Sequence, residues 1–207
     1  MKKKIAILGS TGSIGKSTID ILRKDKKNFD VVLLTTNNNY REILKQAKEF
    51  KARNIIINNK KHFLTSKKKL RNNKINIFNN FQSFNNKFKS KIDFSMSAIS
   101  GLEGLKPTLD LIKFSKTIAI ANKESIICAW NLIQQRLNKY KTKFIPVDSE
   151  HFSIWSLLDG NSSNSVEEVI ITASGGPFLK LSLNKFKKIK PQIAVNHPNW
   201  KMGKKIS

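Results

Sequence analysis

The strongest indication of how the chain folds lies near its start, in the stretch Ile5-Ala6-Ile7-Leu8-Gly9-Ser10-Thr11-Gly12-Ser13-Ile14-Gly15. Its first four residues are apolar and bounded by glycine, which predicts a short buried strand. The three glycines then follow the spacing G-x-x-G-x-x-G, and helical apolar spacing continues over Ser17–Lys24. A strand, a glycine turn and a helix in this order are typical of dinucleotide binding, which we favour over a simple glycine-rich turn.

The three glycines have separate expected roles. The first permits a tight turn, the middle one lets a pyrophosphate approach the backbone, and the last lets the helix pack closely on the strand. The start of the helix then offers free N–H groups and a partial positive charge to the phosphates.

The same alternation of strands and helices continues along the chain. Further strands are predicted at Val31–Thr35, Asn54–Ile57, Phe94–Ile99, Thr117–Ala121 and Lys143–Val147, and further helices at Tyr40–Phe50, Leu105–Phe114 and Ile126–Leu137. Such alternation predicts an α/β fold, a Rossmann-like doubly wound parallel sheet with helices on its faces.

The character of the sequence changes after Val147. A polar linker is expected at Ser156–Ser165, a strand at Val166–Thr172 and a helix at Leu181–Lys188. We therefore expect two domains, residues 1–147 and residues 148–207, with the cofactor turn in the first.

Composition excludes several classes of protein. The chain has 207 residues and one cysteine, so it cannot be a small disulfide scaffold. It has no apolar run long enough for a membrane span, and the apolar run after Met1-Lys2-Lys3-Lys4 is too short for a secretory signal, which predicts a cytoplasmic protein.

The net charge of +25 suggests a nucleic-acid partner, but only five of the 39 basic residues are arginine. Selection for gripping phosphates should enrich arginine, and lysine is abundant here together with asparagine, isoleucine and phenylalanine. We therefore favour compositional drift. In the Lys/Asn-rich segment Lys60–Lys91 we expect a helix and a short strand, and we interpret its phenylalanines as apolar anchors rather than as a platform for stacking bases.

The end of the second predicted strand indicates the type of dinucleotide. Enzymes that use NAD place Asp or Glu about 20 residues beyond the glycines to bind the ribose 2′-hydroxyl. This chain has Thr35-Thr36-Asn37-Asn38-Asn39 there, with Arg41 the nearby arginine. Without a carboxylate to repel a 2′-phosphate, the sequence favours NADP.

Four more motifs follow predicted strands or lie in loops. They are Ala121-Asn122-Lys123-Glu124-Ser125, Pro146-Val147-Asp148-Ser149-Glu150-His151, Thr172-Ala173-Ser174-Gly175-Gly176-Pro177-Phe178 and Asn196-His197-Pro198-Asn199-Trp200-Lys201-Met202-Gly203. Parallel sheets bind ligands at such strand ends. In an extended segment Asp148 and Glu150 would point to the same side and could hold Mg²⁺ or Mn²⁺. The alternative is a helix start, with Asp148 or Ser149 as the cap and Glu150 in the first turn.

Taken in order, these motifs resemble the 1-deoxy-D-xylulose 5-phosphate reductoisomerase family. The resemblance runs from Lys4 to Ser207 and is weakest over Lys60–Lys91. It implies conversion of 1-deoxy-D-xylulose 5-phosphate to 2-C-methyl-D-erythritol 4-phosphate in isoprenoid biosynthesis. A divalent metal would polarise the substrate oxygens, the carbon skeleton would rearrange, and NADPH would deliver a hydride.

The resemblance also implies the site residues. NADPH would be bound by Thr11, Gly12, Ser13, Ile14, Asn38, Asn122, Glu124 and Gly203. The metal would be held by Asp148 and Glu150, and the catalytic and substrate contacts would come from Lys123, Ser149, Glu150, Ser174 and His197. The family is usually a homodimer with a sugar-phosphate substrate and no specific nucleic-acid or membrane partner.

Two departures from the family pattern bear on function. The family usually has glycine where Thr36 stands and often a basic or small residue where Asn37 stands. The family also continues past Ser207 with V-D-S-A-T and N-K-x-x-E segments, which supply phosphate contacts and a third metal carboxylate, and then a helical domain. Residues 148–207 are therefore expected to be an incomplete catalytic domain of a truncated chain. The alternatives are an inactive NADP-binding remnant and a basic nucleic-acid-binding protein.

Overall fold

The structure is a computed structural model that describes residues 1–70, 74–158, 166–172 and 175–196. The chain divides into two compact units, Met1–Asn161 and Ser162–Ser207. The domain boundary expected between residues 147 and 148 stays a prediction.

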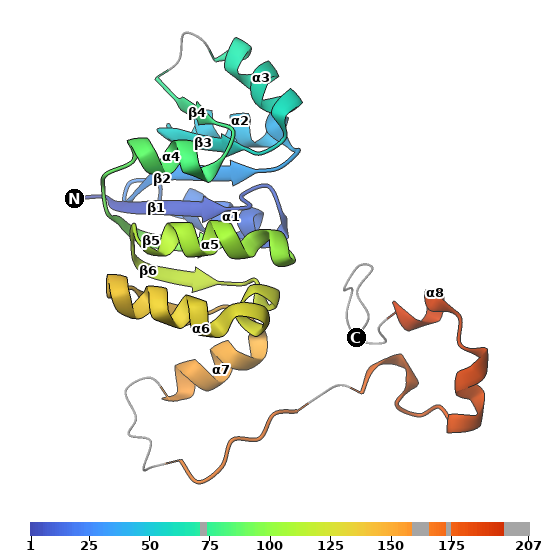
Figure 1. Ribbon diagram of the computed structural model, residues 1–207. Coiled ribbons are helices and arrows are strands. Elements are labelled where there is room, and N and C mark those ends of the chain that lie inside the picture. Colours follow the sequence, from blue (N-terminus) through green and yellow to red (C-terminus); the bar gives the residue numbers. More distant parts are fainter. Residues whose placement is uncertain (71–73, 159–165, 173–174, 197–207) are drawn as a thin grey trace. The chain divides into compact units, whose positions relative to one another are not determined.

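A parallel sheet forms the centre of the first unit (Figure 1). Among the described residues it has seven strands in the order β4-β3-β2-β1-β5-β6-β7. The strands are β1 (Lys3–Leu8), β2 (Phe29–Thr36), β3 (Asn54–Ile57), β4 (Asn76–Phe78), β5 (Ile92–Ser97), β6 (Ser115–Ile120) and β7 (Lys143–Pro146). The strand order reverses at β1, which pairs with β2 on one side and β5 on the other. The crevice beyond the carboxyl ends of these strands is where such sheets bind ligands.

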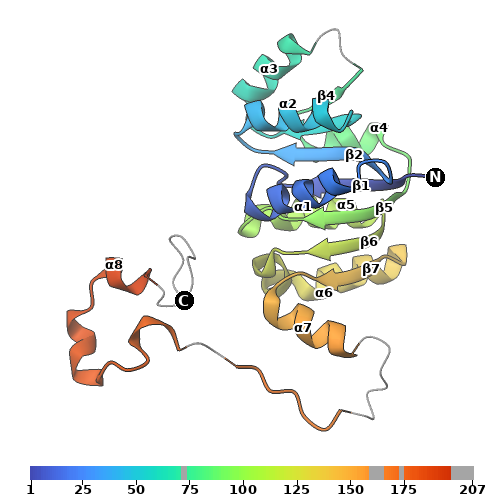
Figure 2. The ribbon, with the colours of Figure 1, turned by 180° about the vertical axis from the view of Figure 1, so that it is seen from behind.

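Helices cover both faces of the sheet, as Figures 1 and 2 show from opposite sides. The helices of this unit are α1 (Ser13–Lys24), α2 (Tyr40–Glu49), α3 (Lys60–Lys69), α4 (Phe81–Lys87), α5 (Leu105–Ile112), α6 (Lys123–Tyr140) and α7 (Ser149–Leu158), with a short 3-10 helix, η1 (Leu102–Gly104). Helices α1 and α2 lie on one face, and α4, α5 and α6 lie on the other. The predicted doubly wound α/β fold is confirmed.

The alternation of side chains along β1 explains why this strand is central. Ile5 and Ile7 pack in the apolar cluster under α1 and α2, and Ala6 and Leu8 pack in the cluster under α4 and α5. All four side chains are buried. A strand buried on both faces needs a continuous apolar run, and that is how it differs from a strand with one face in water.

The phenylalanines of residues 60–91 are anchors for the helices, as interpreted from the sequence. Phe78, Phe81 and Phe84 are buried, and Phe84 meets Phe78 edge-on with their ring centroids 5.7 Å apart. Phe84 also stacks on Phe88 at 4.8 Å. Rings buried in this way cannot stack on bases, so they add nothing to the nucleic-acid hypothesis.

Two predicted helices begin earlier in the structure than in the sequence analysis. Helix α1 begins at Ser13 rather than Ser17, directly after the glycine turn. Helix α6 begins at Lys123 rather than Ile126, because the Asn122 side chain accepts a hydrogen bond from the Ser125 N–H and caps the helix. Capping by a side chain fixes the start of a helix more firmly than apolar spacing does.

The described part of residues 162–207 contains three short helical segments. They are η3 (Gly176–Phe178), η4 (Leu183–Lys188) and α8 (Pro191–Ala194). The strand predicted at Val166–Thr172 is wrong, because these residues pair with no strand in the part of the chain that the structure describes, and Ile170 is 74% exposed. The helix predicted at Leu181–Lys188 is a 3-10 helix that begins at Leu183. In the described ranges, no helix has the length and apolar character needed to cross a membrane.

Candidate functional site

Two of the three glycines in the turn after β1 are required by the backbone itself. Gly9 has φ +73°, and a Cβ atom there would lie 2.7 Å from the carbonyl oxygen of Ala98. A Cβ atom on Gly15 would overlap the carbonyl oxygen of Gly9. The first and last glycines therefore serve the tight turn and the helix packing, as predicted.

Gly12 differs from the other two because protein packing does not demand it. Its φ is −78°, and a Cβ atom there would meet nothing closer than the Gly9 carbonyl oxygen at 3.4 Å. Gly12 is the residue that precedes α1, and no side chain in the described ranges caps this helix. The space beside Gly12 thus opens onto free N–H groups at the positive end of a helix, an arrangement that suits a phosphate.

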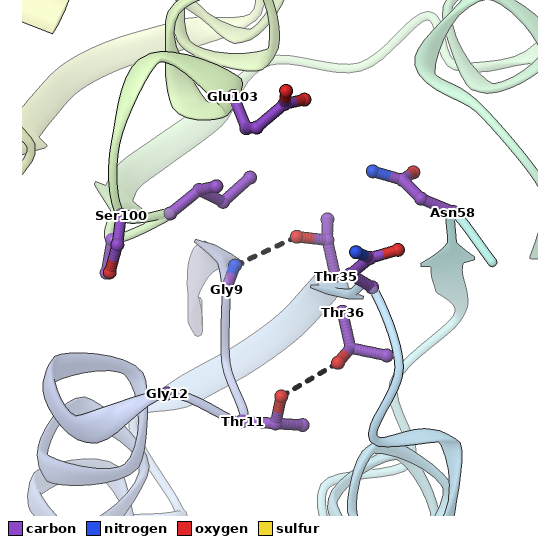
Figure 3. A pocket seen from close by; sticks show the side chains of 11 residues that line it. Gly9, Thr11, Gly12, Thr35, Thr36, Asn58, Ser100 and Glu103 are labelled. Atoms are coloured by element: carbon purple, nitrogen blue, oxygen red, sulfur yellow. Dashed lines mark hydrogen bonds between the residues drawn. The ribbon is translucent and has the colours of Figure 1, made fainter.

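The end of β2 is bonded directly to the glycine turn. The Gly9 N–H donates to Thr35 Oγ1 at 2.9 Å, and the Thr11 and Thr36 hydroxyl oxygens lie 2.7 Å apart (Figure 3). Behind the turn, the buried Gln46 amide of α2 donates to the Ser10 carbonyl oxygen at 3.1 Å. These contacts hold the turn in one position before any ligand binds.

A cavity of about 620 Å³ lies over the turn, and we call it the glycine-turn pocket. It is lined by Gly9, Thr11, Gly12, Thr35, Thr36, Asn37, Asn58, Ala98, Ile99, Ser100 and Glu103. Its walls come from the ends of β1, β2, β3 and β5, which is the crevice expected where the strand order reverses. Its volume is in the range that small-molecule and cofactor sites have.

The described residues that line the pocket at the end of β2 include no carboxylate. Thr36 and Asn37 line the pocket there. The next residue, Asn38, is exposed and accepts a hydrogen bond from the Asn59 side chain at 3.0 Å. Arg41 points its Nε toward the Tyr40 hydroxyl at 3.5 Å, and this contact lowers the pKa of Tyr40. The end of β2 is therefore polar and uncharged, and Arg41 and Glu42 follow in the first turn of α2.

Asn122 fixes the opposite wall of the glycine-turn pocket. Its side chain is buried, and Nδ2 donates to the carbonyl oxygens of Ile99 at 2.5 Å and Gly101 at 2.7 Å. Its Oδ1 caps α6 through Ser125. The amide is thus occupied within the protein, and its contacts position the loop after β5. Lys123 and Glu124 follow in the first turn of α6, with Lys123 exposed.

The segment after β7 forms a helix start rather than an extended strand. Asp148 Oδ1 accepts from the His151 N–H at 2.9 Å and lies 2.6 Å from His151 Nδ1. Ser149 and Glu150 are exposed in the first turn of α7. The expectation that an extended backbone turns both carboxylates to one side is wrong, because helical backbone begins directly after Asp148.

The environment of Asp148 favours its charged form. Burial by itself raises the pKa of the Asp148 carboxyl, but the hydrogen bonds from the His151 backbone and ring outweigh burial and lower the pKa. In the described ranges, no group of three or more His, Cys, Asp or Glu side chains could hold a metal ion.

Lys123 and Asp148 both line a second cavity, of about 460 Å³, between α6, β7 and α7. Its other walls are mostly apolar, with Ile127, Trp130 and Trp155 among the lining residues. The structure therefore brings together two predicted site residues here, and places Thr11 and Gly12 together at the glycine-turn pocket.

Comparison with known proteins identifies the family. Residues 5–130 match the family profile described as 1-deoxy-D-xylulose 5-phosphate reductoisomerase, and residues 144–207 match the profile of its C-terminal domain. The chain belongs to the 1-deoxy-D-xylulose 5-phosphate reductoisomerase family.

A reductoisomerase of Pelagibacter ubique is 61% identical over 207 residues, which cover 99% of this chain and 53% of that protein. One from a Wolbachia species of Brugia malayi is 40% identical over 99% of this chain and 53% of its own length. The chain thus spans about half the length of these relatives.

Solved reductoisomerase structures have the same fold. The enzyme from Zymomonas mobilis in complex with NADPH matches with a TM-score of 0.87 and 34% identity over 96% of this chain and 52% of its own. A reductoisomerase in complex with NADPH, fosmidomycin and magnesium matches with a TM-score of 0.81 and 29% identity over 98% and 52%.

Several residues that the reductoisomerase resemblance implies either do not line the glycine-turn pocket or lie outside the described residues. Ser13 and Ile14 are exposed in the first turn of α1, next to the pocket residues Thr11 and Gly12. Ser174, His197 and Gly203 lie outside the described residues.

Sequence reasoning missed three side chains that line the glycine-turn pocket, Asn58, Ser100 and Glu103. Each follows the end of a strand that the sequence did predict. The signal available was therefore their position after β3 and β5. The strand order was needed to show that β5 lies beside β1 and that β3 is separated from β1 only by β2.

Proposed function

We propose that this chain is the NADPH-binding half of a reductoisomerase that converts 1-deoxy-D-xylulose 5-phosphate to 2-C-methyl-D-erythritol 4-phosphate. The observation that carries the proposal is the glycine-turn pocket. It joins a helix start that no described side chain caps, an open Gly12 and an end of β2 whose described pocket-lining residues include no carboxylate. A relative that is 61% identical is named 1-deoxy-D-xylulose 5-phosphate reductoisomerase, and the similar Zymomonas structure is a complex with NADPH.

The residues of the pocket fit the parts of NADPH. The N–H groups at the start of α1 bind the pyrophosphate beside Thr11 and Gly12. Thr36 and Asn37, which line the pocket, and the neighbouring Asn38 meet the ribose that carries the 2′-phosphate. No carboxylate is found among the described residues that line the pocket at the end of β2. Asn122 keeps the loop after β5 in place through Ile99 and Gly101. When bound, NADPH supplies the hydride for the reduction.

The substrate side of the proposal rests on the segment after β7 and on Lys123. Asp148 and Glu150 offer the hard oxygen ligands that Mg²⁺ and Mn²⁺ prefer, and both lie at the start of α7. Two carboxylates leave most of the coordination sphere to other oxygens. Lys123, Ser149, Ser174 and His197 are proposed to contact the sugar phosphate, and Glu124 and Gly203 to line the cofactor.

The proposed partners are a sugar-phosphate substrate and a second copy of the full-length protein. The proposed location is the cytoplasm. The excess of lysine over arginine in a chain of net charge +25 supports compositional drift rather than a specific nucleic-acid partner.

Calorimetric titration of the 207-residue chain with NADPH and with NADH tests the cofactor proposal. NADPH should bind and should bind more tightly than NADH. Failure of both to bind at millimolar concentration would contradict it. Titration of the chain with DNA at rising salt concentrations tests the nucleic-acid alternative. It should show only binding that disappears at moderate ionic strength.

Turnover is tested on a protein of full family length whose first 207 residues are this chain. NADPH oxidation should require both the sugar phosphate and Mg²⁺ or Mn²⁺. NADPH binding without any turnover would instead support an inactive cofactor-binding protein.

A further inference from the structure

Two polar side chains face each other across the glycine-turn pocket without a partner. Glu103 lies in η1 after β5, and Asn58 follows β3. In the described part of the chain, neither side chain makes a hydrogen bond or an ion pair, and both are exposed. Figure 3 shows the Glu103 carboxylate and the Asn58 amide directed toward one another across the cavity.

Both side chains lie away from the start of α1. In Figure 3 Glu103 and Asn58 lie on one side of Gly9, and Thr11 and Gly12 lie on the other. In the strand order Asn58 follows β3, which β2 separates from β1, whereas Glu103 follows β5, the neighbour of β1 on the other side. A dinucleotide with its pyrophosphate on the glycine turn directs its adenosine ribose toward the second strand. The base at the end of that ribose then reaches the space between Asn58 and Glu103.

The charge of Glu103 limits what can occupy this space. An ionised carboxylate only accepts hydrogen bonds, and it repels phosphate. The Asn58 amide both donates and accepts. The exposed edge of adenine offers an amino donor at N6 next to an acceptor at N1, which matches a carboxylate beside an amide.

The loop that carries Glu103 is held in place by its contacts with the Asn122 side chain. Gly104 is buried, and a Cβ atom there would overlap the Asn122 side chain. Asn122 in turn binds the carbonyl oxygens of Ile99 and Gly101. A carboxylate on a fixed loop loses little freedom when it binds a ligand, which favours selective recognition.

We propose that Glu103 and Asn58 recognise the adenine base of the dinucleotide, with the Glu103 carboxylate accepting from the N6 amino group and the Asn58 amide donating to N1. The proposal rests on the proposed function, since it assigns a base-recognition role within the same cofactor pocket.

The test compares NADPH with its hypoxanthine analogue, in which a carbonyl oxygen replaces the N6 amino group. Each is titrated calorimetrically into the 207-residue chain and its Glu103→Gln variant. The chain should bind NADPH about tenfold more tightly than the analogue, because two oxygen acceptors then face each other. Glu103→Gln should weaken NADPH binding and remove the preference, since an amide can donate to the analogue's oxygen.

Asp110→Asn is the matched control, because Asp110 is a nearby carboxylate paired with Lys106 outside this pocket. It should leave the ratio of the two affinities unchanged. Equal binding of both nucleotides by the unmodified chain would overturn the role of Glu103 and leave the proposed function standing. Failure of the chain to bind NADPH at all would instead overturn the proposed function, and this inference with it.

Discussion

The glycine-turn pocket and the segment Asp148–His151 both lie at the carboxyl ends of strands, but they are built differently. The walls of the pocket come from four strand ends joined by hydrogen bonds such as Gly9–Thr35 and Asn122–Ile99. The Asp148 segment is the start of one helix, with Ser149 and Glu150 exposed. The walls of the glycine-turn pocket all come from residues 9–103, whereas the proposed substrate site also draws on Ser174 and His197, far along the chain.

The largest effect expected at the glycine-turn pocket is the loss of stability caused by Gly15→Ala. The new methyl group would overlap the Gly9 carbonyl oxygen, so α1 or the turn must shift. We expect a loss of roughly 2–4 kcal/mol in the free energy of unfolding, as for overpacking against fixed backbone. Urea unfolding followed by circular dichroism measures it. A loss under 1 kcal/mol would show that the turn is less rigid than its contacts indicate.

The next effect is that of Asn122→Ala on the other wall of the pocket. The change leaves the carbonyl oxygens of Ile99 and Gly101 without their donor and removes the cap of α6. We expect a loss of about 2–3 kcal/mol in stability, and weaker NADPH binding. Asn38→Ala, at an exposed asparagine, is the control and should leave stability within about 0.5 kcal/mol.

Gly12→Ala should separate binding from stability. The structure has room for the methyl group, but the group would occupy the approach to the start of α1. We expect unfolding to change by less than about 1 kcal/mol while the dissociation constant for NADPH rises about tenfold or more. Calorimetry and urea unfolding on the same preparation give both numbers. Unchanged affinity would mean that phosphate does not approach Gly12.

The smallest effect is expected at the segment Asp148–His151. Asp148→Ala removes the cap of α7 and its contact with His151, which should cost about 1 kcal/mol. NADPH affinity should stay the same, because Asp148 does not line the glycine-turn pocket. A change in NADPH affinity would contradict the separation of the two regions.

The part of the fold predicted best from the sequence is the part with local causes. The apolar run at Ile5–Leu8 and the three glycines predict β1, the turn and α1, because each depends only on its neighbours in the chain. The strand predicted at Val166–Thr172 fails for the opposite reason. Its β-branched residues suit a strand, but a strand also needs a partner, and residues 166–172 pair with no other described segment.

Local sequence signals likewise predict only some of the residues of the candidate site. Thr11 and Gly12 belong to a recognisable turn, so the sequence places them correctly in the pocket. Glu103 and Asn58 belong to no motif, and only the strand order brings them to one cavity. At Asp148 a local signal did exist, since an aspartate followed by a helical run is a common helix cap. The alternative of a helix start was the one that the structure shows.

The central place of β1 also bears on when the pocket forms. Ile5 pairs with Phe94 of β5, and the Lys4 N–H donates to Asp93 at 2.8 Å, across 89 residues of chain. Contacts between such distant residues form slowly, since a long loop must close first. During synthesis the pocket therefore stays open on one side until the chain through Glu103 has emerged. A nucleotide that contacts both walls therefore binds only after β5 has paired with β1, and its binding then stabilises the paired sheet.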